Sequence, residues 1–551
     1  MPSLLKRFLC PLFVACLLIT TRAAFGAQDR TPPTGASAGF YKVAGTIVSK
    51  TDGHPLERAR VMLQDAKDSR KYEAIITQAG GKFDFENVPA GKYSLTGEKR
   101  EYIPASYDQH DQYSTAIVTG AGLETENLVL KIAPTAVIWG RVLDEAGEPV
   151  RHASVALYYD DHQQGVHQIR RRSGGQTDDL GTYEMAHLAA GTYFLSVTAT
   201  PWYAVHPPSN GAPQSKSPIS RSLDVAYPVT YYADVSDSET ATPIPVKGGD
   251  RLQVDIHLNP VPALRLTFKV PGDPQHGFVF PRLEQPDFDG STFVQSGGGN
   301  FISPGVFEVT GVPAGQYNIR MQGQGTNVQM NGVDVTKDGE QIDTTTAEAL
   351  GKLKVSIEIP GESSPPQAIN VGLLGKGRNL AGSRVLDQKG EVEINDIPAG
   401  RYQFYLWGPR RPYAIARITA EGAEVSGKAI VLGAGASASA NLTLIGGSVE
   451  ISGVAKKADR GFAGAMVVLV PRDPENNRNL FRRDQSDLDG TFVLHNVVPG
   501  SYSLLAIEDG WDLDWSQPAV IAAYAKHGRP IELRDSAKVL ELTEPLAVHS
   551  K

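Results

Sequence analysis

Apolar and polar residues alternate along much of this chain. Leu264, Leu266, Phe268 and Val270 are separated by polar side chains, and positions 353–359 follow the same rule. A period of two residues is typical of a strand that buries one face. A helical period of 3.6 residues is suggested only around residues 520–526. The pattern therefore predicts a nearly all-β protein with at most a short helix in that segment.

One fifteen-residue pattern occurs five times. Its first copy, from Gly81 to Leu95, contains Gly-x-Phe and then Val-Pro-Ala-Gly-x-Tyr. In every copy two glycines are ten residues apart and a tyrosine follows two positions later. These residues are Gly81, Gly91 and Tyr93; Gly181, Gly191 and Tyr193; Gly305, Gly315 and Tyr317; Gly390, Gly400 and Tyr402; Gly490, Gly500 and Tyr502.

The pattern predicts a strand, a tight turn and a returning strand, which is a hairpin. The tyrosine falls early in the second strand, where its ring can fill the core while its hydroxyl reaches a backbone acceptor. We interpret these five tyrosines as structural residues with no catalytic part.

The repeat spacing sets the domain organisation. The first glycines recur at intervals of 100, 124, 85 and 100 residues, which is close to the usual size of one β-sandwich. We expect five tandem antiparallel sandwiches of transthyretin-like or immunoglobulin-like type. Their predicted ranges are 40–133, 134–260, 261–349, 350–445 and 446–551. The second range carries an insertion, 201–247, and the third and fourth copies have diverged.

The shared residues resemble the carboxypeptidase regulatory-like domain. In addition to the repeat, a Gly-strand-Pro-Ala-x-Val block precedes the first copy, at Gly45, Pro55, Ala59 and Val61. The match is good in domains one, two and five. The resemblance implies a transthyretin-like sandwich related to carbohydrate-binding-like folds, in arrays that look like secreted proteins of acidobacteria-type organisms. Members of this family are mostly accessory or of unknown function, and similar domains occur in peptidases, transporters and adhesins, so the fold does not identify a function.

The N-terminus has the features of an export signal. Lys6 and Arg7 precede an apolar run of about a dozen residues, and small residues follow at Ala24 and Gly26. We expect residues 1–26 to be a cleaved signal peptide and 27–39 to be a linker. A membrane anchor would need about 20 apolar residues. Lipidation at Cys16 is a further alternative, since Phe13 to Cys16 loosely resembles a lipoprotein box.

Cleavage would change both cysteine content and charge. The chain's two cysteines, Cys10 and Cys16, both lie in the predicted leader, so the mature domains would hold together without disulfides. Loss of the leader's three basic residues would shift the formal charge from −8 to −11. Such a charge argues against nucleic acid as a partner. We expect a secreted or periplasmic, outer-envelope location with no transmembrane segment in the mature chain.

Three motifs raise the question of a metal. His54 and Glu57 have the spacing of a metallocarboxypeptidase zinc pair, but the equivalent turn of domain two lacks a histidine. Asp484, Asp487 and Asp489 resemble part of a calcium loop without its acidic twelfth position.

The third motif is a possible ligand loop. His162 and His167, followed by the arginines 170–172, could bind a metal or an anion, although a solvated hairpin tip is the simpler interpretation. No nucleophile elbow, P-loop or dinucleotide signature stands out. We therefore predict no catalytic residue, cofactor or metal.

Aromatic residues offer the better functional hypothesis, because sugar rings stack on exposed aromatic faces. The candidates are Trp202, Tyr203, Tyr231, Tyr232, Trp511 and Trp515. The alternative is that these rings seal contacts between neighbouring sandwiches. The sequence thus favours an exported, non-catalytic binding or spacer protein for a polysaccharide or cell-envelope protein. A secreted metallopeptidase-like hydrolase with a site assembled between domains is the alternative.

Overall fold

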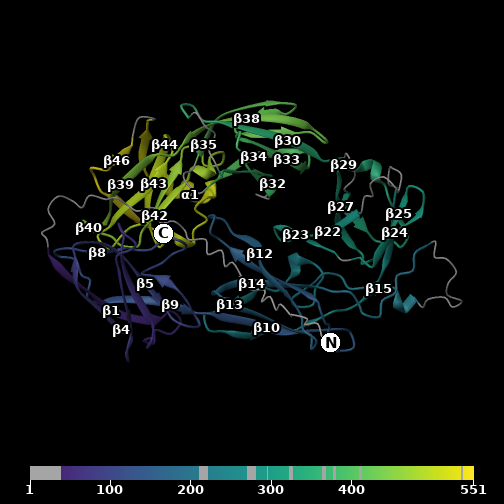
Figure 1. Cartoon of the computed structure of the whole chain (residues 1–551), viewed down its shortest axis with the longest axis horizontal. Helices are drawn as coiled ribbons and strands as arrows, with labels where there is room; N and C mark the ends of the chain where they lie inside the picture. The colour runs from purple at the N-terminus through teal and green to yellow at the C-terminus, as the bar shows by residue number, and fades with distance from the viewer. Residues whose placement is uncertain are drawn as a thin grey trace, which may run out of the picture.

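The computed structural model describes residues 39–209, 221–269, 281–294, 296–321, 327–362, 368–375, 380–408, 413–534 and 538–551. These residues form β-sandwiches that follow one another along the chain (Figure 1). We call them sandwiches 1 to 5, with strands β1–β9, β10–β20, β21–β29, β30–β38 and β39–β47. The predicted leader and most of the predicted linker lie outside the described residues.

Sandwich 1 has two sheets. One contains β4 (Lys82–Pro89), β1 (Phe40–Ser49), β9 (Leu128–Pro134) and β6 (Tyr102–Ile103). The other contains β3 (Tyr72–Ile76), β2 (Arg60–Asp65), β5 (Gly91–Glu98) and β7 (Ala105–Ser106), with β8 (Ile117–Thr119) also paired to β5.

Sandwich 2 repeats this plan. Its first sheet contains β13 (Thr182–Leu188), β10 (Ala136–Leu143), β18 (Arg251–Gln253) and β19 (Ile256–His257). Its second contains β12 (Gln168–Gln176), β11 (Ser154–Asp161), β14 (Gly191–Thr198), β16 (Thr230–Tyr231) and β17 (Ile244–Val246). A small third sheet pairs β15 (Val225–Ala226) with β20 (Val261–Pro262).

Sandwiches 3 and 4 keep the plan despite their diverged sequences. In sandwich 3 the sheets contain β24 (Gly298–Ser303), β25 (Val306–Val312), β21 (Leu264–Lys269) and β28 (Glu340–Ile342), and β23 (Gly290–Phe293), β22 (Pro281–Asp287), β26 (Gly315–Met321), β27 (Val328–Val335) and β29 (Glu348–Ala349). In sandwich 4 they contain β33 (Glu391–Ile397), β30 (Gly351–Glu358), β38 (Ser437–Gly446) and β35 (Tyr413–Glu421), and β32 (Leu380–Val385), β31 (Asn370–Leu374), β34 (Gly400–Trp407), β37 (Ala429–Leu432) and β36 (Glu424–Ser426).

Sandwich 5 joins its strands into one continuous sheet, because β47 pairs with both β39 and β44. Its strands are β39 (Val449–Lys457), β40 (Arg460–Gly461), β41 (Met466–Pro471), β42 (Arg482–Gln485), β43 (Thr491–Val497), β44 (Gly500–Glu508), β45 (Arg529–Leu533), β46 (Val539–Glu541) and β47 (Leu546–Ser550). The α-helix α1 (Pro518–Ala525) confirms the short helix expected near residues 520–526. The described 3₁₀ turns are η1 (Arg221–Leu223), η2 (Ser238–Thr240), η3 (Thr344–Thr346), η5 (Arg478–Leu480) and η6 (Gly510–Asp512).

The five repeated segments are not hairpins, and this corrects the sequence-based expectation. In sandwich 1 the strand before the turn, β4, pairs with β1, whereas the strand after it, β5, pairs with β2 in the opposite sheet. The strand partners divide in the same way in the other four sandwiches, although in sandwich 5 β47 joins the two layers into one sheet. A period of two identifies a strand but not its partner. The repeat therefore marks the corner where the chain crosses from one sheet to the other.

Each corner turns on a residue in the left-handed backbone region, six positions before the tyrosine. These residues are Asn87, His187, Gly311, Asp396 and Asn496, with φ of 58°, 57°, 72°, 61° and 55°. Glycine and short polar side chains tolerate this conformation best. The first strand of every sandwich has a register shift opposite its corner. The bulge and the left-handed residue together bend the chain toward the second sheet.

The repeated tyrosine fastens the corner, as expected. Its ring is buried in every copy, and its hydroxyl donates to the carbonyl four residues upstream. The acceptors are Pro89, Ala189, Pro313, Pro398 and Val498, at 3.0, 2.9, 2.6, 2.7 and 2.7 Å. Burial raises the pKa of Tyr502 to about 12, so the hydroxyl keeps its proton at physiological pH.

Each sandwich encloses a core of its own. Some side chains depart from this rule, and Ala414 of sandwich 4 packs into the core of sandwich 5. Val229, Tyr231 and Ala241, from the predicted 201–247 insertion of sandwich 2, pack into the core of sandwich 3. The first strand of each sandwich also pairs in parallel with a late strand, so the sheets are not purely antiparallel.

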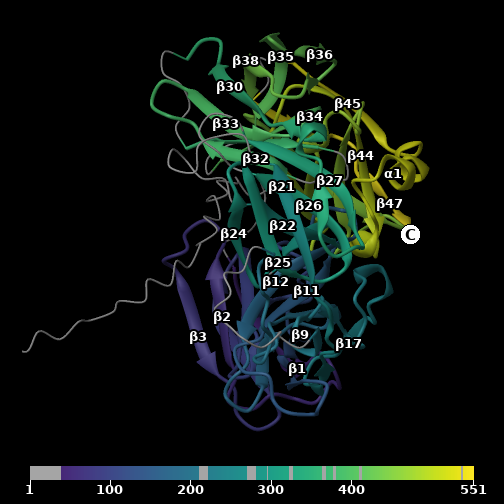
Figure 2. The same cartoon turned by 90° about the vertical axis from the view of Figure 1, so that its right-hand side faces the viewer.

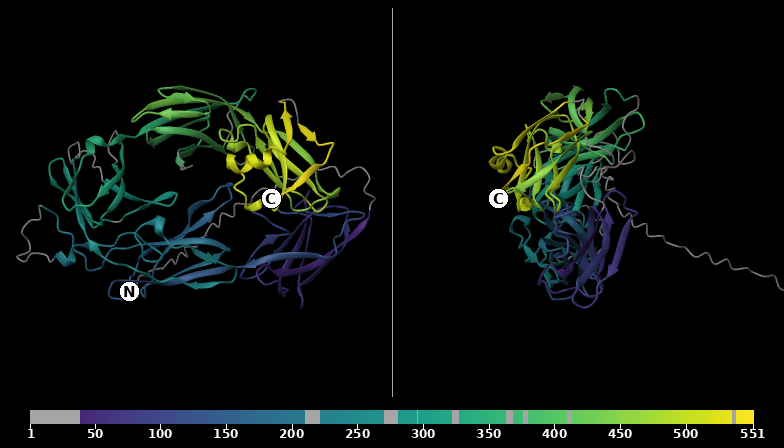
Figure 3. Two further views of the ribbon diagram at one scale, coloured as in Figure 1. Left: turned by 180° about the vertical axis from the view of Figure 1, so that it is seen from behind. Right: turned by 90° about the vertical axis from the view of Figure 1, so that its left-hand side faces the viewer.

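The array bends back on itself. Figures 1 and 3 show sandwich 5 (yellow) beside sandwiches 1 and 2 (purple and blue), and Figure 2 shows the two tiers from the side. Hydrogen bonds between residues almost 400 positions apart hold this closure. Among the described residues, none of the helices has the length and apolar character needed to cross a bilayer.

Replacing a corner tyrosine tests its structural importance. We expect Tyr317→Phe to cost about 1 kcal/mol of the unfolding free energy of sandwich 3, because the buried Pro313 carbonyl loses its donor. Hydrogen exchange of the segment 305–321 in the full chain measures this locally. Tyr72→Phe, on the exposed β3 strand, is the control. Equal protection in both variants would contradict the assignment.

Candidate functional site

The seam between sandwiches 1 and 5 is polar and closely matched. Lys92 Nζ lies 2.5 Å from Asp487 Oδ2, and both side chains are largely buried. The other oxygen of Asp487 accepts from the Ala116 N–H at 3.1 Å, and the Leu488 N–H donates to the Ala116 carbonyl. A paired carboxylate that also accepts a backbone hydrogen bond suits a buried position. This contact locks the two loops in one register.

Arg483 connects sandwich 5 to both of its distant neighbours. Its guanidinium pairs with Asp111 of sandwich 1 at 3.2 Å and reaches the Gln163 carbonyl of sandwich 2 at 3.5 Å. It also lies over the Trp515 ring, 4.1 Å from the ring centroid. Only 6% of this side chain is exposed. A guanidinium suits this position because it stacks and pairs at the same time.

Trp511 and Trp515, which we predicted as possible ligand-stacking residues, are buried in this seam. Each is 9% exposed. Trp511 stacks on His110 of sandwich 1, with ring centroids 5.1 Å apart and planes 8° apart. Trp515 packs against Phe481 within sandwich 5 and faces Gly165 of sandwich 2. The structure thus places both rings at a domain junction, which was the alternative interpretation.

The candidates near residue 201 separate into two groups. Tyr231 is fully buried and meets Phe288 of sandwich 3 edge to face, so its ring is not available for stacking on a ligand. Tyr232 packs against the core of sandwich 2. Trp202 remains 83% exposed, with Tyr203 edge-on to it at 5.8 Å.

The earlier metal motifs have ordinary structural partners. His54 Nδ1 lies 2.5 Å from Asp52 in an exposed turn. In the aspartate triplet, Asp484 accepts from the Val493 N–H and Asp489 from the Thr491 N–H, while Asp487 belongs to the seam. Backbone hydrogen bonds within turns and strands account for Asp484 and Asp489.

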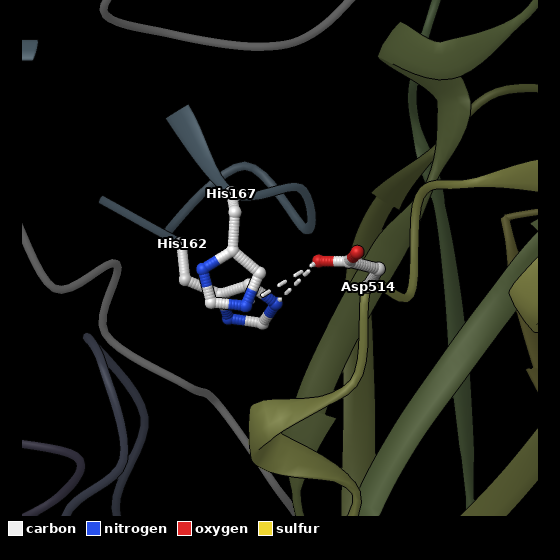
Figure 4. A group of neighbouring side chains, drawn as sticks. All are labelled: His162, His167 and Asp514. Atoms are coloured by element: carbon white, nitrogen blue, oxygen red, sulfur yellow. Dashed lines mark ion pairs between the residues drawn. The ribbon is translucent and has the colours of Figure 1, made fainter. Parts of the chain in front are cut away.

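The histidine loop of sandwich 2 meets an unexpected partner. His162 and His167 lie between β11 and β12, and Asp514 approaches them from sandwich 5 (Figure 4). One candidate ligand atom from each residue lies within 4.8 Å of the others. The arginines expected to share this loop have other contacts: Arg170 reaches Gln164 and Gln168, and Arg172 lies over the Tyr159 ring.

The main cavity lies where sandwiches 3, 4 and 5 meet. It has a volume of about 1060 Å³, and the fourth corner, Pro398 to Tyr405, forms one of its walls. The η5 loop of sandwich 5 forms another, and β26 and β27 of sandwich 3 form the third. The amide side chains on the lining are Gln329, Asn331, Gln403, Asn476, Asn477 and Asn479.

Charge in this cavity is mostly positive. Its cations are Arg320, Arg401, Lys428 and Arg478, whereas Glu475 is the one carboxylate among the described lining residues. Burial lowers the pKa of Lys428, whose ammonium contacts Asn477 Oδ1 at 2.5 Å.

Three polar atoms of this lining are buried without a hydrogen-bond partner among the described residues. They are Arg320 Nε, Gln329 Oε1 and Arg478 Nε. A buried polar atom left in this state costs about 1–3 kcal/mol. Such atoms need an explanation, and a bound polar ligand is one. Sequence reasoning missed this site because its walls come from three domains.

The comparisons with known proteins agree with the architecture of the first sandwich. Residues 42–126 match the carboxypeptidase regulatory-like domain, which confirms the resemblance there. No curated protein matches the chain. Similar solved structures include the Bacillus anthracis TIE protein, with 8% identity, 95% of this chain and 76% of the other covered, and a TM-score of 0.17.

Pilin structures are also among the similar ones. The minor pilin GBS52 of Streptococcus agalactiae has 14% identity, covers 40% of this chain and 97% of its own, and has a TM-score of 0.21. The Bacillus cereus major pilin subunit BcpA has 11% identity, covers 56% and 99%, and has a TM-score of 0.14. At such low TM-scores these likenesses carry no argument about the function of this chain.

Removing the Arg483 side chain tests the closure. We expect Arg483→Ala to weaken docking of sandwich 5 by about 2 kcal/mol, because Asp111 loses a charged partner and three rings lose the guanidinium. Small-angle X-ray scattering should show a larger radius of gyration. Arg460→Ala, at an exposed site of the same sandwich, is the matched control. An unchanged scattering profile for Arg483→Ala would refute this assignment.

Proposed function

We propose that this protein is an exported, non-catalytic binding protein, and that it holds an acidic polysaccharide of the cell envelope between sandwiches 3, 4 and 5. The observation that carries the proposal is a set of three buried atoms, one each in Arg320, Gln329 and Arg478, that have no hydrogen-bond partner within the part of the chain that the structure describes. They belong to three side chains that line one cavity.

The chemistry of the lining supports a sugar ligand. Each amide side chain both donates and accepts hydrogen bonds, as a sugar hydroxyl does. The Tyr405 ring, half-buried on the cavity wall, adds a flat surface for a pyranose face. A volume near 1000 Å³ is at the upper end for small-ligand pockets and gives room for several sugar units.

The charge of the lining supports an acidic sugar over a neutral one. Arginine pairs with carboxylates through two parallel hydrogen bonds, and this cavity offers three arginines. The chain as a whole carries a formal charge of −8, so the positive lining is a local feature. A carboxylate on the ligand would pair with the guanidinium groups that line the cavity.

The hydrolase alternative has weaker support at this cavity. Glycoside hydrolysis usually needs two carboxyl groups, and the described lining contains Glu475 alone. Two other functions remain as alternatives: a spacer that binds no ligand, and a module that binds a protein of the envelope. A binding experiment distinguishes them from the proposed function.

The proposal predicts which side chain matters. We expect the full chain to bind polygalacturonate but not neutral dextran, and Arg320→Ala to weaken that binding at least tenfold, because a buried guanidinium–carboxylate contact is lost. Isothermal titration calorimetry measures the affinity.

Two controls sharpen the result. Arg460→Ala removes an exposed arginine outside the cavity and should leave affinity unchanged. Trp202→Ala tests the other exposed aromatic patch. Loss of binding in Trp202→Ala with none in Arg320→Ala would move the site to sandwich 2. If the chain binds no glycan on an array of acidic polysaccharides, the proposed function is wrong and the spacer function is favoured.

A further inference from the structure

Two loops from different sandwiches bring three metal-binding side chains together. His162 and His167 begin and end the loop between β11 and β12. Asp514 follows the η6 turn of sandwich 5. Its Oδ1 atom lies 3.1 Å from His162 Nε2 and 3.9 Å from His167 Nε2. Figure 4 shows both imidazole rings directed toward this carboxylate.

The two loops are already docked on each other. The Ser516 N–H donates to the Gly165 carbonyl at 3.1 Å, and the Ser516 hydroxyl donates to the Gln164 carbonyl at 2.7 Å. Gly165 has φ of 70°, and any side chain there would collide with the Trp515 ring. The backbones on both sides of the cluster are therefore held independently of its three side chains.

His167 is oriented as a metal-ligating histidine usually is. Asp160 Oδ1 lies 3.0 Å from His167 Nδ1, a contact that holds the proton on Nδ1 and leaves Nε2 with its lone pair. On the other ring, His162 Nε2 is buried with no hydrogen-bond partner among the described residues, and so is Asp514 Oδ1. These two atoms face each other, but they are not aligned for a hydrogen bond.

We propose that His162, His167 and Asp514 bind one divalent transition-metal ion, with zinc the best match, and that this ion clasps sandwich 5 to sandwich 2. Two imidazoles and a carboxylate form a donor set that zinc accepts, with a water as fourth ligand. Calcium and magnesium prefer oxygen ligands throughout. The side chains need only small rotations to approach a zinc–nitrogen distance of about 2 Å.

The positions of the three ligands indicate that a bound ion would stabilise the closed array. Its ligands come from both sides of a seam, so binding favours the docked state over any state in which sandwich 5 has moved away. The loop next to Asp514 also carries Trp515, over which Arg483 lies. This inference is independent of the polysaccharide proposal, because neither histidine lines the main cavity.

Cobalt(II) is a direct probe of this geometry, since its visible absorption reports four-coordinate nitrogen and oxygen ligation. We expect the untagged full chain to bind one equivalent of Co²⁺, which Zn²⁺ then displaces. His167→Ala should abolish the absorption, and its exposed side chain makes misfolding a minor concern. Asp160→Asn should weaken Co²⁺ binding about tenfold, because it weakens the hydrogen bond that Asp160 accepts from His167 Nδ1.

His257→Ala is the matched control. His257 also pairs with an aspartate, Asp234 at 3.2 Å, on the surface of sandwich 2, but it belongs to no group of three candidate metal ligands among the described residues. It should bind Co²⁺ as the unmodified chain does. Binding that survives in His162→Ala/His167→Ala, or that His257→Ala removes equally, would overturn the proposed site.

A second measurement tests the clasp itself. We expect Zn²⁺ to slow hydrogen exchange of segments 162–167 and 510–517 in the unmodified chain, and to have no such effect in Asp514→Asn. Metal binding without added protection at either segment would refute the clasp. Neither assay uses a polysaccharide, so its outcome does not depend on whether the cavity binds one.

Discussion

The corner between the two sheets is the constraint on which this structure depends. A sandwich forms only if the chain leaves one sheet and enters the other, and at this crossing its backbone groups lose their neighbours in the ladder. The tyrosine hydroxyl restores one hydrogen bond at this place in all five copies, for example from Tyr317 to the Pro313 carbonyl. A left-handed residue six positions earlier supplies the bend. The third and fourth copies have diverged elsewhere, but between these two points they keep the Val/Ile-Pro-Ala-Gly sequence of the first copy, at 312–315 and 397–400.

The repeat could be predicted from the sequence, but the strands with which its two strands pair could not. Spacing predicted correctly that the five tyrosines fill the core and bond to the backbone, because ring and acceptor are close in the chain. The hairpin was wrong because the partners of β4 and β5 lie far away in sequence and leave no trace in a period of two. The same limit applies to Tyr231. Its position in a long insertion suggested exposure, yet it fills the core of sandwich 3, which no local pattern describes.

The contacts of the seam between sandwich 5 and sandwiches 1 and 2 could not be predicted either, although several of its residues were candidates for other functions. The sequence predicted Asp487 as part of a calcium-like triplet, and Trp511 and Trp515 as possible sugar-stacking rings. Their actual partners, Lys92, His110 and Gly165, lie more than 300 residues away. A buried ion pair such as Lys92–Asp487 adds little net stability, because desolvation offsets most of its attraction. In any other docking register, however, a buried charge would lose its partner, which costs free energy. The pair therefore selects one way of closing the array. The apolar rings around Arg483 then supply the burial that favours closure.

Sandwich 5 links the two proposed sites. Its η5 loop forms one wall of the cavity, and the segment after η6 carries Asp514. If sandwich 5 docks in only a fraction of molecules, any ligand that needs the complete cavity binds with an affinity reduced by that fraction. A metal ion that holds Asp514 against sandwich 2 would raise the docked fraction and so recover part of the lost ligand affinity. By linkage, the ligand would increase the affinity for the metal by the same factor. The closed array is in this sense the functional unit, because neither the three-walled cavity nor the two-sided histidine cluster exists in any single sandwich.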